Sequence, residues 1–200
     1  MKFLSPRPKP LPEELKRRSR DALALFDAGQ YASAEQAWEA LLIDCDRDLG
    51  PVHPETITTL DRIGSAMLRQ RRPDESADRH REAHRRAVRA FGRNDPATLI
   101  YAYNLGCAHV ETQQWGKGLP VLTETLRRQR SRLGKSHPDT LATAKTLGAS
   151  QFLAGDTLAA LQLLGASYNL ASEAFGPDDP LAQDLAETLG MVLRDSSQSG

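Results

Sequence analysis

The sequence has few aromatic residues, only two cysteines and no net charge. Aromatic residues make up 6% of the chain, so the core has to be built mainly from alanine, leucine and valine. This composition favours closely packed helices over a thick sheet sandwich. No apolar run approaches the roughly 20 residues of a membrane-spanning helix, and the N-terminus lacks an apolar stretch of signal-peptide length. These absences predict a cytoplasmic protein that does not enter a membrane.

The two cysteines are Cys45 and Cys107. Without an export signal, two reduced thiols are expected rather than a disulfide. Arginine outnumbers lysine by 20 to 6, which together with the alanine and leucine content indicates a GC-rich bacterial genome.

Charge is balanced overall but uneven along the chain. Residues 62–135 carry 16 basic and 7 acidic residues, whereas residues 146–200 carry seven acidic residues and a single basic one, Arg194. Such asymmetry could steer an anionic partner or pair molecules head to tail. Solvated helix faces are the favoured interpretation, because arginine and glutamate suit exposed helix positions.

A repeat of 42 residues dominates the sequence. Four segments align without gaps, namely Leu49–Thr56, Phe91–Thr98, Leu133–Thr140 and Phe175–Ala182, and each contains a glycine followed four residues later by a proline. The glycine suits the left-handed conformation that ends a helix. The proline suits the first position of the next helix, where its missing N–H costs no hydrogen bond. Asp95 and Asp179, and less well His53 and His137, are placed to cap these helices.

Each repeat is therefore predicted to be a pair of antiparallel helices. The first helices are expected at 12–28, 54–71, 96–113 and 138–154, and the second helices at 31–48, 74–91, 117–133 and 157–175. Pro120 predicts a late start for the third of these second helices. Residues 180–194 are expected to form a capping helix without a mate. The predicted organisation is a proline-rich lead-in at 1–11, a helical array at 12–194 and a disordered tail at 195–200.

Small residues recur in two columns at the same 42-residue spacing. The first column holds Ala22, Gly64, Gly106, Gly148 and Gly190, and the second holds Ala34, Ser76, Gly118 and Ala160. Glycine inside a helix costs roughly 1 kcal/mol relative to alanine. A column that keeps it indicates close backbone contact, and we expect the two columns to face each other within each hairpin.

These columns, with the turn Gly29-Gln30-Tyr31-x-x-Ala34, resemble the tetratricopeptide repeat (TPR). The 42-residue period with Leu133-Gly134-x-x-His137-Pro138-x-Thr140 resembles the kinesin-light-chain-type subclass, which is also common in bacteria. The resemblance implies an all-α, right-handed α-solenoid of four helix hairpins and a C-terminal capping helix. It also implies a concave surface, lined by the first helices, that binds peptides.

No catalytic or cofactor-binding motif is present, and no metal or cofactor is expected. His80 and His84 have a spacing that can offer two imidazoles to a metal. Their repeat columns hold Trp38, Leu122, Leu164 and Leu42, Leu126, Tyr168, so histidines that pack in a core or interface are the favoured interpretation. The basic segments 79–89 and 127–132 could contact phosphates. Neutral overall charge and few aromatic residues make nucleic acid an unlikely ligand.

The candidate binding residues lie on the predicted concave face of the first helices. A helical projection from the glycine column places one polar face on each first helix. The candidate ligand-binding residues on these faces are Lys16, Arg20, Arg62, Arg69, Tyr103, Asn104 and Lys145. Asn104 resembles the asparagine that family members use to hold a ligand backbone, but its repeat counterparts are Arg20, Arg62 and Thr146. The excess of positive charge predicts a ligand of acidic character, and the acidic residues Asp184 and Glu187 would repel its negative end.

Three functions remain open at this point. The first is a non-catalytic adaptor that binds a protein or peptide segment in the concave groove. The second is a small-molecule or biosynthetic enzyme or accessory protein that uses the groove as a pocket. The third is the repeat module of a signalling system whose effector lies on another chain.

Overall fold

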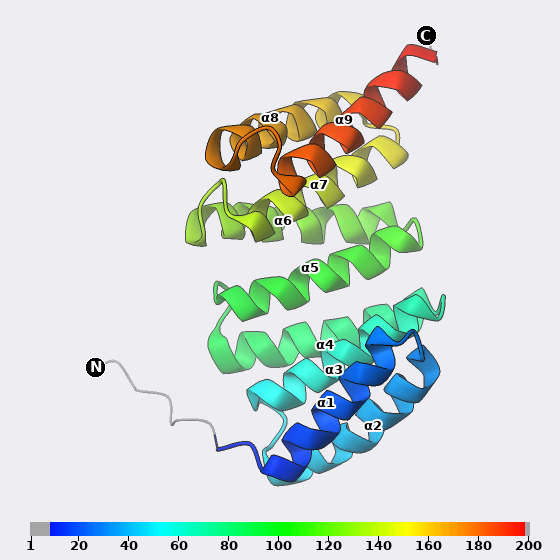
Figure 1. Cartoon of the computed structure of the whole chain (residues 1–200), viewed down its shortest axis with the longest axis vertical. Coiled ribbons are helices and arrows are strands. Elements are labelled where there is room, and N and C mark those ends of the chain that lie inside the picture. Colours follow the sequence, from blue (N-terminus) through cyan, green and yellow to red (C-terminus); the bar gives the residue numbers. More distant parts are fainter. Residues whose placement is uncertain (1–8, 199–200) are drawn as a thin grey trace, which may run out of the picture. The chain divides into compact units, whose positions relative to one another are not determined.

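The computed structural model describes residues 9–198, and in that range the regular structure is α-helical (Figure 1). The helices are α1 (Glu13–Asp27), α2 (Tyr31–Asp48), α3 (Pro54–Arg69), α4 (Pro73–Phe91), α5 (Pro96–Glu111), α6 (Trp115–Arg132), α7 (Pro138–Leu153), α8 (Thr157–Phe175) and α9 (Pro180–Gln198). They form two compact units, unit 1 up to Ala108 and unit 2 from His109 onward. The all-α class predicted from the repeat is confirmed.

The helix boundaries follow the chemistry of the repeated turn. Gly50, Gly92, Gly134 and Gly176 all have φ between 90° and 101°, the region that favours glycine. Each is followed by a cap whose side chain accepts a backbone N–H. The Asp95 and Asp179 carboxylates accept at 2.9 Å, and His53 and His137 accept through Nδ1 at 3.2 and 3.1 Å. Carboxylates and imidazoles therefore fill the same capping position.

Unit 1 contains the hairpins α1–α2 and α3–α4 and most of α5. Its core cluster is built around large, fully buried side chains, among them Trp38, Leu41, Ile57 and Ile63. Unit 2 contains α6, the hairpin α7–α8 and α9. Its core cluster consists of smaller aliphatic residues, namely Leu141, Ala160, Leu164, Ala171, Ala182, Leu185 and Val192.

The glycine column has a different neighbour from the one expected. A Cβ built on Gly64 would lie 3.0 Å from the imidazole of His80, and one built on Gly148 would lie 2.7 Å from Cγ of Leu164. These large residues come one turn after the small residues Ser76 and Ala160, which we had expected to face the glycines. The column therefore stays small because a bulky side chain of the second helix lies directly on its backbone.

Three other expectations concern the boundaries of helices and terminal segments. Helix α6 begins at Trp115 with Pro120 inside it, so the predicted late start is wrong. The proline is the sixth residue of the helix, past the first turn, so the carbonyl of Gly116 lacks the N–H partner that residue 120 would otherwise supply. Helix α9 continues to Gln198, so the boundary expected after residue 194 lies within a helix. Residues 1–8 of the expected lead-in and 199–200 of the expected tail lie outside the described residues.

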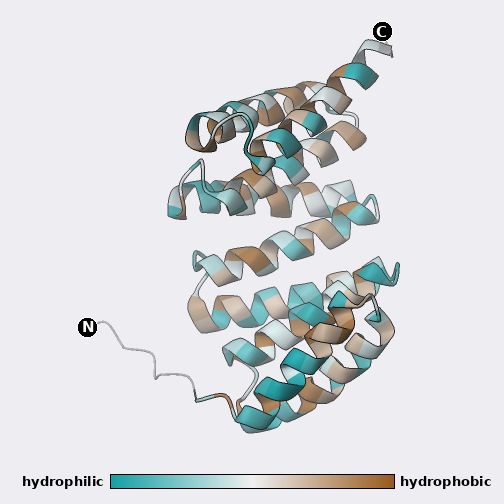
Figure 2. Ribbon diagram, in the orientation of Figure 1, coloured by the Kyte–Doolittle hydropathy of each residue, from teal (hydrophilic) through white to brown (hydrophobic). Residues whose placement is uncertain are grey.

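Hydrophobic and hydrophilic residues are interspersed along the helices (Figure 2). In the described range, none of the helices is both long enough and apolar enough to cross a bilayer.

Candidate functional site

Arg62 and Arg69, two of the predicted cations, lie on α3 in unit 1 and contact other helices of the unit. Arg62 donates from Nη1 to Oγ of Ser19 on α1 at 2.8 Å, and its guanidinium carbon lies 6.0 Å from the ring centroid of Trp38. Arg69 donates from Nη2 to the hydroxyl of Tyr31 at 2.6 Å and stacks over that ring at 4.9 Å. Both guanidinium groups are therefore held in place by aromatic and hydroxyl groups.

Asn104 on α5 belongs to a polar cluster that links three helices of unit 1. Its Nδ2 donates to both carboxylate oxygens of Asp61 on α3, at 2.9 and 3.2 Å. Nδ1 of His80 on α4 lies 2.6 Å from Oδ1 of the same carboxylate. Asp61 is 9% exposed and His80 is 1% exposed. The buried carboxylate thus orients the Asn104 amide from below.

Sequence reasoning missed this cluster, although one signal was visible. His80 occupies a column that otherwise holds Trp38, Leu122 and Leu164. A polar residue at a buried position needs a hydrogen-bond partner. The partner is Asp61, which lies in the neighbouring first helix, α3.

Four of the six candidate residues of unit 1 line two hollows. Arg69 and Asn104 line a small one of about 120 Å³, together with Ser65 and Cys107. Lys16 and Arg20 line a second one of about 280 Å³. Lys16 donates a hydrogen bond to Glu13 at 2.6 Å, and this bond, together with the nearby charge of Arg20, lowers the pKa of Glu13.

Unit 2 has a hollow of about 370 Å³ that is lined mainly by α7 and α9, the first helices of their repeats. We call the surface formed by the first helices of a unit its first-helix side. The candidate Lys145 lines this hollow together with other residues of α7 and α9, namely Thr146, Ala149, Leu153, Thr188 and Met191. Leu153 and Met191 are 66% and 41% exposed, which leaves apolar surface open to a ligand. Nζ of Lys145 donates to Asp184 at 2.5 Å, so the acid expected to repel a ligand is paired within the unit.

Tyr103, the remaining candidate, is half-buried on α5. It is not among the residues that line the three hollows described above.

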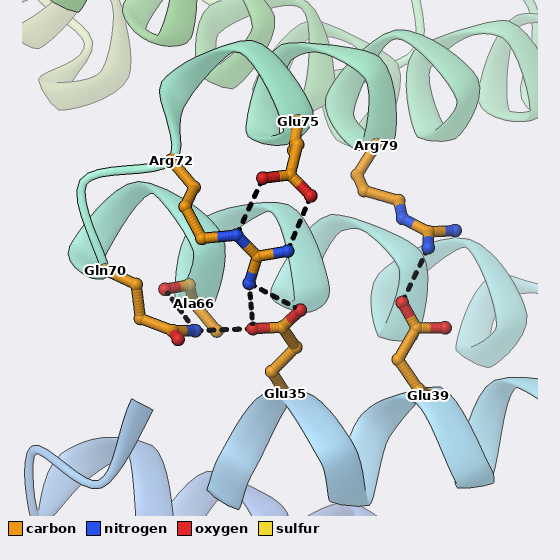
Figure 3. A network of polar contacts seen from close by, with 7 residues as sticks. All are labelled: Glu35, Glu39, Ala66, Gln70, Arg72, Glu75 and Arg79. Atoms are coloured by element: carbon orange, nitrogen blue, oxygen red, sulfur yellow. Dashed lines mark hydrogen bonds and ion pairs between the residues drawn. The ribbon is translucent and has the colours of Figure 1, made fainter. Parts of the chain in front are cut away.

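The basic segment of α4 pairs with acids of its own unit (Figure 3). Arg72 contacts both Glu35 on α2, at 2.8 Å, and Glu75, at 2.6 Å. Arg79 pairs with Glu39 at 2.7 Å, and Arg86 pairs with Asp46 at 2.7 Å. Helices α2 and α4 are thus joined by three ion pairs, which we call the α2–α4 ladder. Arginines used in this way are poorly placed to bind phosphates.

Cys45 and Cys107 are not in a disulfide, and their surroundings differ. Burial, and secondly the Glu55 carboxylate, raises the pKa of the Cys45 thiol to about 11. Cys45 is therefore protonated at neutral pH and behaves as a core residue. Cys107 is half-buried and lines the hollow beside Asn104. Across residues 9–198, no three histidines, cysteines or carboxylates are grouped as metal ligands.

The sequence profile of the tetratricopeptide repeat matches residues 22–87, which run from α1 into α4. This segment is therefore similar to the tetratricopeptide repeat (TPR). Three solved structures extend the likeness in fold to most of the chain. The nearly identical TPR-like repeats of a proposed kinesin light chain from Podosopora anserina match with a TM-score of 0.82 at 17% identity, covering 94% of this chain and 89% of that chain. BtubC (BKLC) from P. vanneervenii matches with a TM-score of 0.77 at 16% identity, covering 92% and 73%.

The MamA protein matches less closely, with a TM-score of 0.54 at 14% identity over 94% of both chains. Likeness at these identities concerns the fold, and it confirms the predicted TPR-like helical array. A comparison with curated proteins found no match for this chain.

Proposed function

We propose that this protein is a non-catalytic adaptor whose first helices bind a segment of a partner protein. The tetratricopeptide repeat supports a role in protein interaction in general. The observation that carries the proposal is the hollow of unit 2, where polar residues of α7 and α9 surround the exposed side chains of Leu153 and Met191. An apolar anchor in a polar rim is the usual composition of a protein-binding surface.

Unit 1 supports the preference for an acidic ligand through two of its cations. Lys16, Arg62 and Lys145 each have a carboxylate within 4.0 Å, which compensates their charge. Arg69 instead donates to the neutral hydroxyl of Tyr31, and Arg20 is an exposed residue of α1. Arg20 and Arg69 therefore keep charge available for a ligand carboxylate. Asn104, oriented by Asp61, offers its amide oxygen to a ligand N–H.

The proposal is tested by comparing the proteins that the immobilised protein and its variants capture from lysate. Arg69→Glu and Met191→Glu change the first-helix side of unit 1 and unit 2, and Arg85→Glu changes an exposed position on α4 as the matched control. We expect the first two variants to lose captured proteins that the wild type and the control retain.

The captured segment is then titrated as a peptide over a salt series. We expect Arg69→Glu to weaken binding about tenfold, and affinity to fall as ionic strength rises, because exposed charge pairs are worth about 1 kcal/mol and are screened. Capture that is identical for all variants would refute the assignment to the first-helix side.

A further inference from the structure

The largest hollow described in unit 2 lies on another side of α7. It measures about 850 Å³, compared with about 370 Å³ for the hollow on the first-helix side. Helices α6 and α8 form its walls and α7 forms its floor. Apolar side chains line it, including Leu126, Leu147 and Leu163, and the small residues Ala159 and Ala166 keep its α8 wall low. We call it the α6–α8 groove.

At the matching position of unit 1, the ion pairs of the α2–α4 ladder bridge the two second helices. Two repeat periods separate α2 from α6 and α4 from α8, so each ladder residue has a counterpart in unit 2. The counterparts of Glu39 and Arg79 are Thr123 and Leu163, and both line the groove. In unit 1 those positions form an ion pair at 2.7 Å that joins the two helices (Figure 3). In unit 2 they are neutral, and the groove stays open.

The third ion pair of the ladder, between Asp46 and Arg86, is also lost at the matching positions of unit 2. The counterparts of Asp46 and Arg86 are Arg130 and Leu170, so an ion pair is replaced by a lone cation and an aliphatic residue. Arg130 lies at the groove and has no ion-pair partner among the described residues. The replacement of both ion pairs removes the interactions that join α2 and α4 in unit 1, and it leaves the positive charge of Arg130 beside an apolar surface.

Charge at the groove is of one sign. Helix α6 carries five cations and one acid, since Lys117, Arg127, Arg128, Arg130 and Arg132 oppose Glu124. Arg127 and Arg130 line the groove, and no acidic residue is among its lining residues. The α8 wall is uncharged from Thr157 to Ser172. An occupant with acidic side chains is therefore complementary to the α6 rim, whereas a basic occupant is repelled.

The shape of the groove suits a helix. Two helices flank it, and the small residues Ala159 and Ala166 of α8 allow another backbone to come close. A helix that buries leucine-sized side chains at positions i, i+3, i+4 and i+7 matches such an apolar strip.

We propose that the α6–α8 groove binds an acidic amphipathic helix of a partner protein. The apolar side chains of that helix enter between α6 and α8, and its carboxylates contact Arg130, because Arg127 already pairs with Glu124 at 2.7 Å. This surface is separate from the first-helix side, so the inference does not depend on the function proposed above.

The test uses two synthetic peptides of about five helical turns. Both carry leucines at helical spacing, with flanking glutamates in one and lysines at the same positions in the other. Binding of each fluorescein-labelled peptide to the full chain is measured by anisotropy. We expect saturable binding of the glutamate peptide at least about tenfold tighter than that of the lysine peptide. Equal affinities, or no saturation of the glutamate peptide up to about 1 mM, would overturn the proposal.

Two variants locate the binding. Thr123→Glu/Leu163→Arg transplants the ion pair of unit 1 into the groove, and we expect it to weaken the glutamate peptide at least about tenfold. Arg130→Glu leaves the groove open and reverses a rim charge, so the preference should shift toward the lysine peptide. Arg85→Glu, at an exposed position on α4, is the control and should leave both affinities unchanged, whereas Met191→Glu reports any binding on the first-helix side. Circular dichroism checks that each variant keeps the wild-type helix content.

These variants remain decisive if one of them fails to fold. Wild-type affinity in the folded Thr123→Glu/Leu163→Arg protein would show that the peptide does not enter the groove. Should that protein not fold, an unchanged preference in Arg130→Glu overturns the proposal in the same way. A loss of binding confined to Met191→Glu would place the peptide on the first-helix side and would also overturn it.

Discussion

Units 1 and 2 place different chemistry on matching positions of the same repeat. In unit 1, Asp61 and His80 form a buried polar pair, and their counterparts two repeats later are Lys145 and Leu164. Lys145 reaches outward to Asp184, while Leu164 is fully buried among aliphatic residues. One helical framework thus tolerates either polar links or apolar packing between its helices. The choice also decides which surfaces stay open. In unit 1 the ion pairs of the α2–α4 ladder join the two second helices, whereas in unit 2 the matching helices α6 and α8 lack these pairs and leave a groove.

The largest contrast is expected from removing the buried carboxylate. Asp61→Ala leaves His80 and Asn104 without their acceptor in unit 1, and should lower the free energy of unfolding by about 3 kcal/mol. Lys145→Ala changes the same repeat position in unit 2, where the ion pair with Asp184 is partly exposed, and should cost less than about 1 kcal/mol. Chemical denaturation measures both. Equal losses would contradict the difference that we draw between the units.

The next effect concerns the glycine column, which both units share. Gly148→Ala puts a Cβ 2.7 Å from Leu164 and should destabilise unit 2 by about 2 kcal/mol through overpacking. Gly165→Ala, in the adjacent helix α8, meets open space and should stabilise it by up to about 1 kcal/mol through helix propensity. Thermal and denaturant unfolding of the two variants should therefore move in opposite directions. A shift of the same sign in both would mean that Leu164 does not lie on the glycine.

The smallest effect is expected in the α2–α4 ladder. A double-mutant cycle of Glu39→Ala and Arg79→Ala should give a coupling free energy of about 0.5 kcal/mol, because both side chains are partly exposed. Screening should reduce this coupling toward zero near 1 M salt. The same cycle at Thr123 and Leu163 in unit 2 should show no salt dependence. Coupling that resists salt in unit 1 would mean that the ladder acts through packing rather than charge.

Local chemistry explains why the fold could be predicted so well. The glycine and proline of each repeated turn act on their own backbone, so their positions alone placed the starts of α3, α5, α7 and α9 at Pro54, Pro96, Pro138 and Pro180. Pro120 misled because a proline past the first turn was expected to delay the start of the helix, whereas α6 begins at Trp115 and runs through it. Even the caps at His53 and His137 followed from their place in the column.

The candidate site was harder to predict, because it depends on side-chain partners that are far apart in sequence. Helical projection placed Lys145 on the face of the first helices, and it does line a hollow there, together with Leu153 and Met191. It could not show that Lys145 pairs with Asp184, since several rotamers of a long side chain suit the same backbone. The α6–α8 groove was missed because it results from the loss, in unit 2, of the ion-pairing residues that join the matching helices of unit 1. Comparing Glu39 and Arg79 with Thr123 and Leu163 along the repeat would have found it.

Gly190 makes the array suitable for engineering by extension. It stands in the same column as Gly64 and Gly148, but the atom that lies 3.3 Å from its built Cβ is Nη1 of Arg194, from one turn further along α9. Arg194 is an exposed and flexible side chain, unlike the buried His80 and Leu164. A designed second helix carrying a small residue and a leucine four positions later would displace only this arginine. Because repeats interact mainly with their neighbours, new modules could be joined at α9 without redesigning either unit.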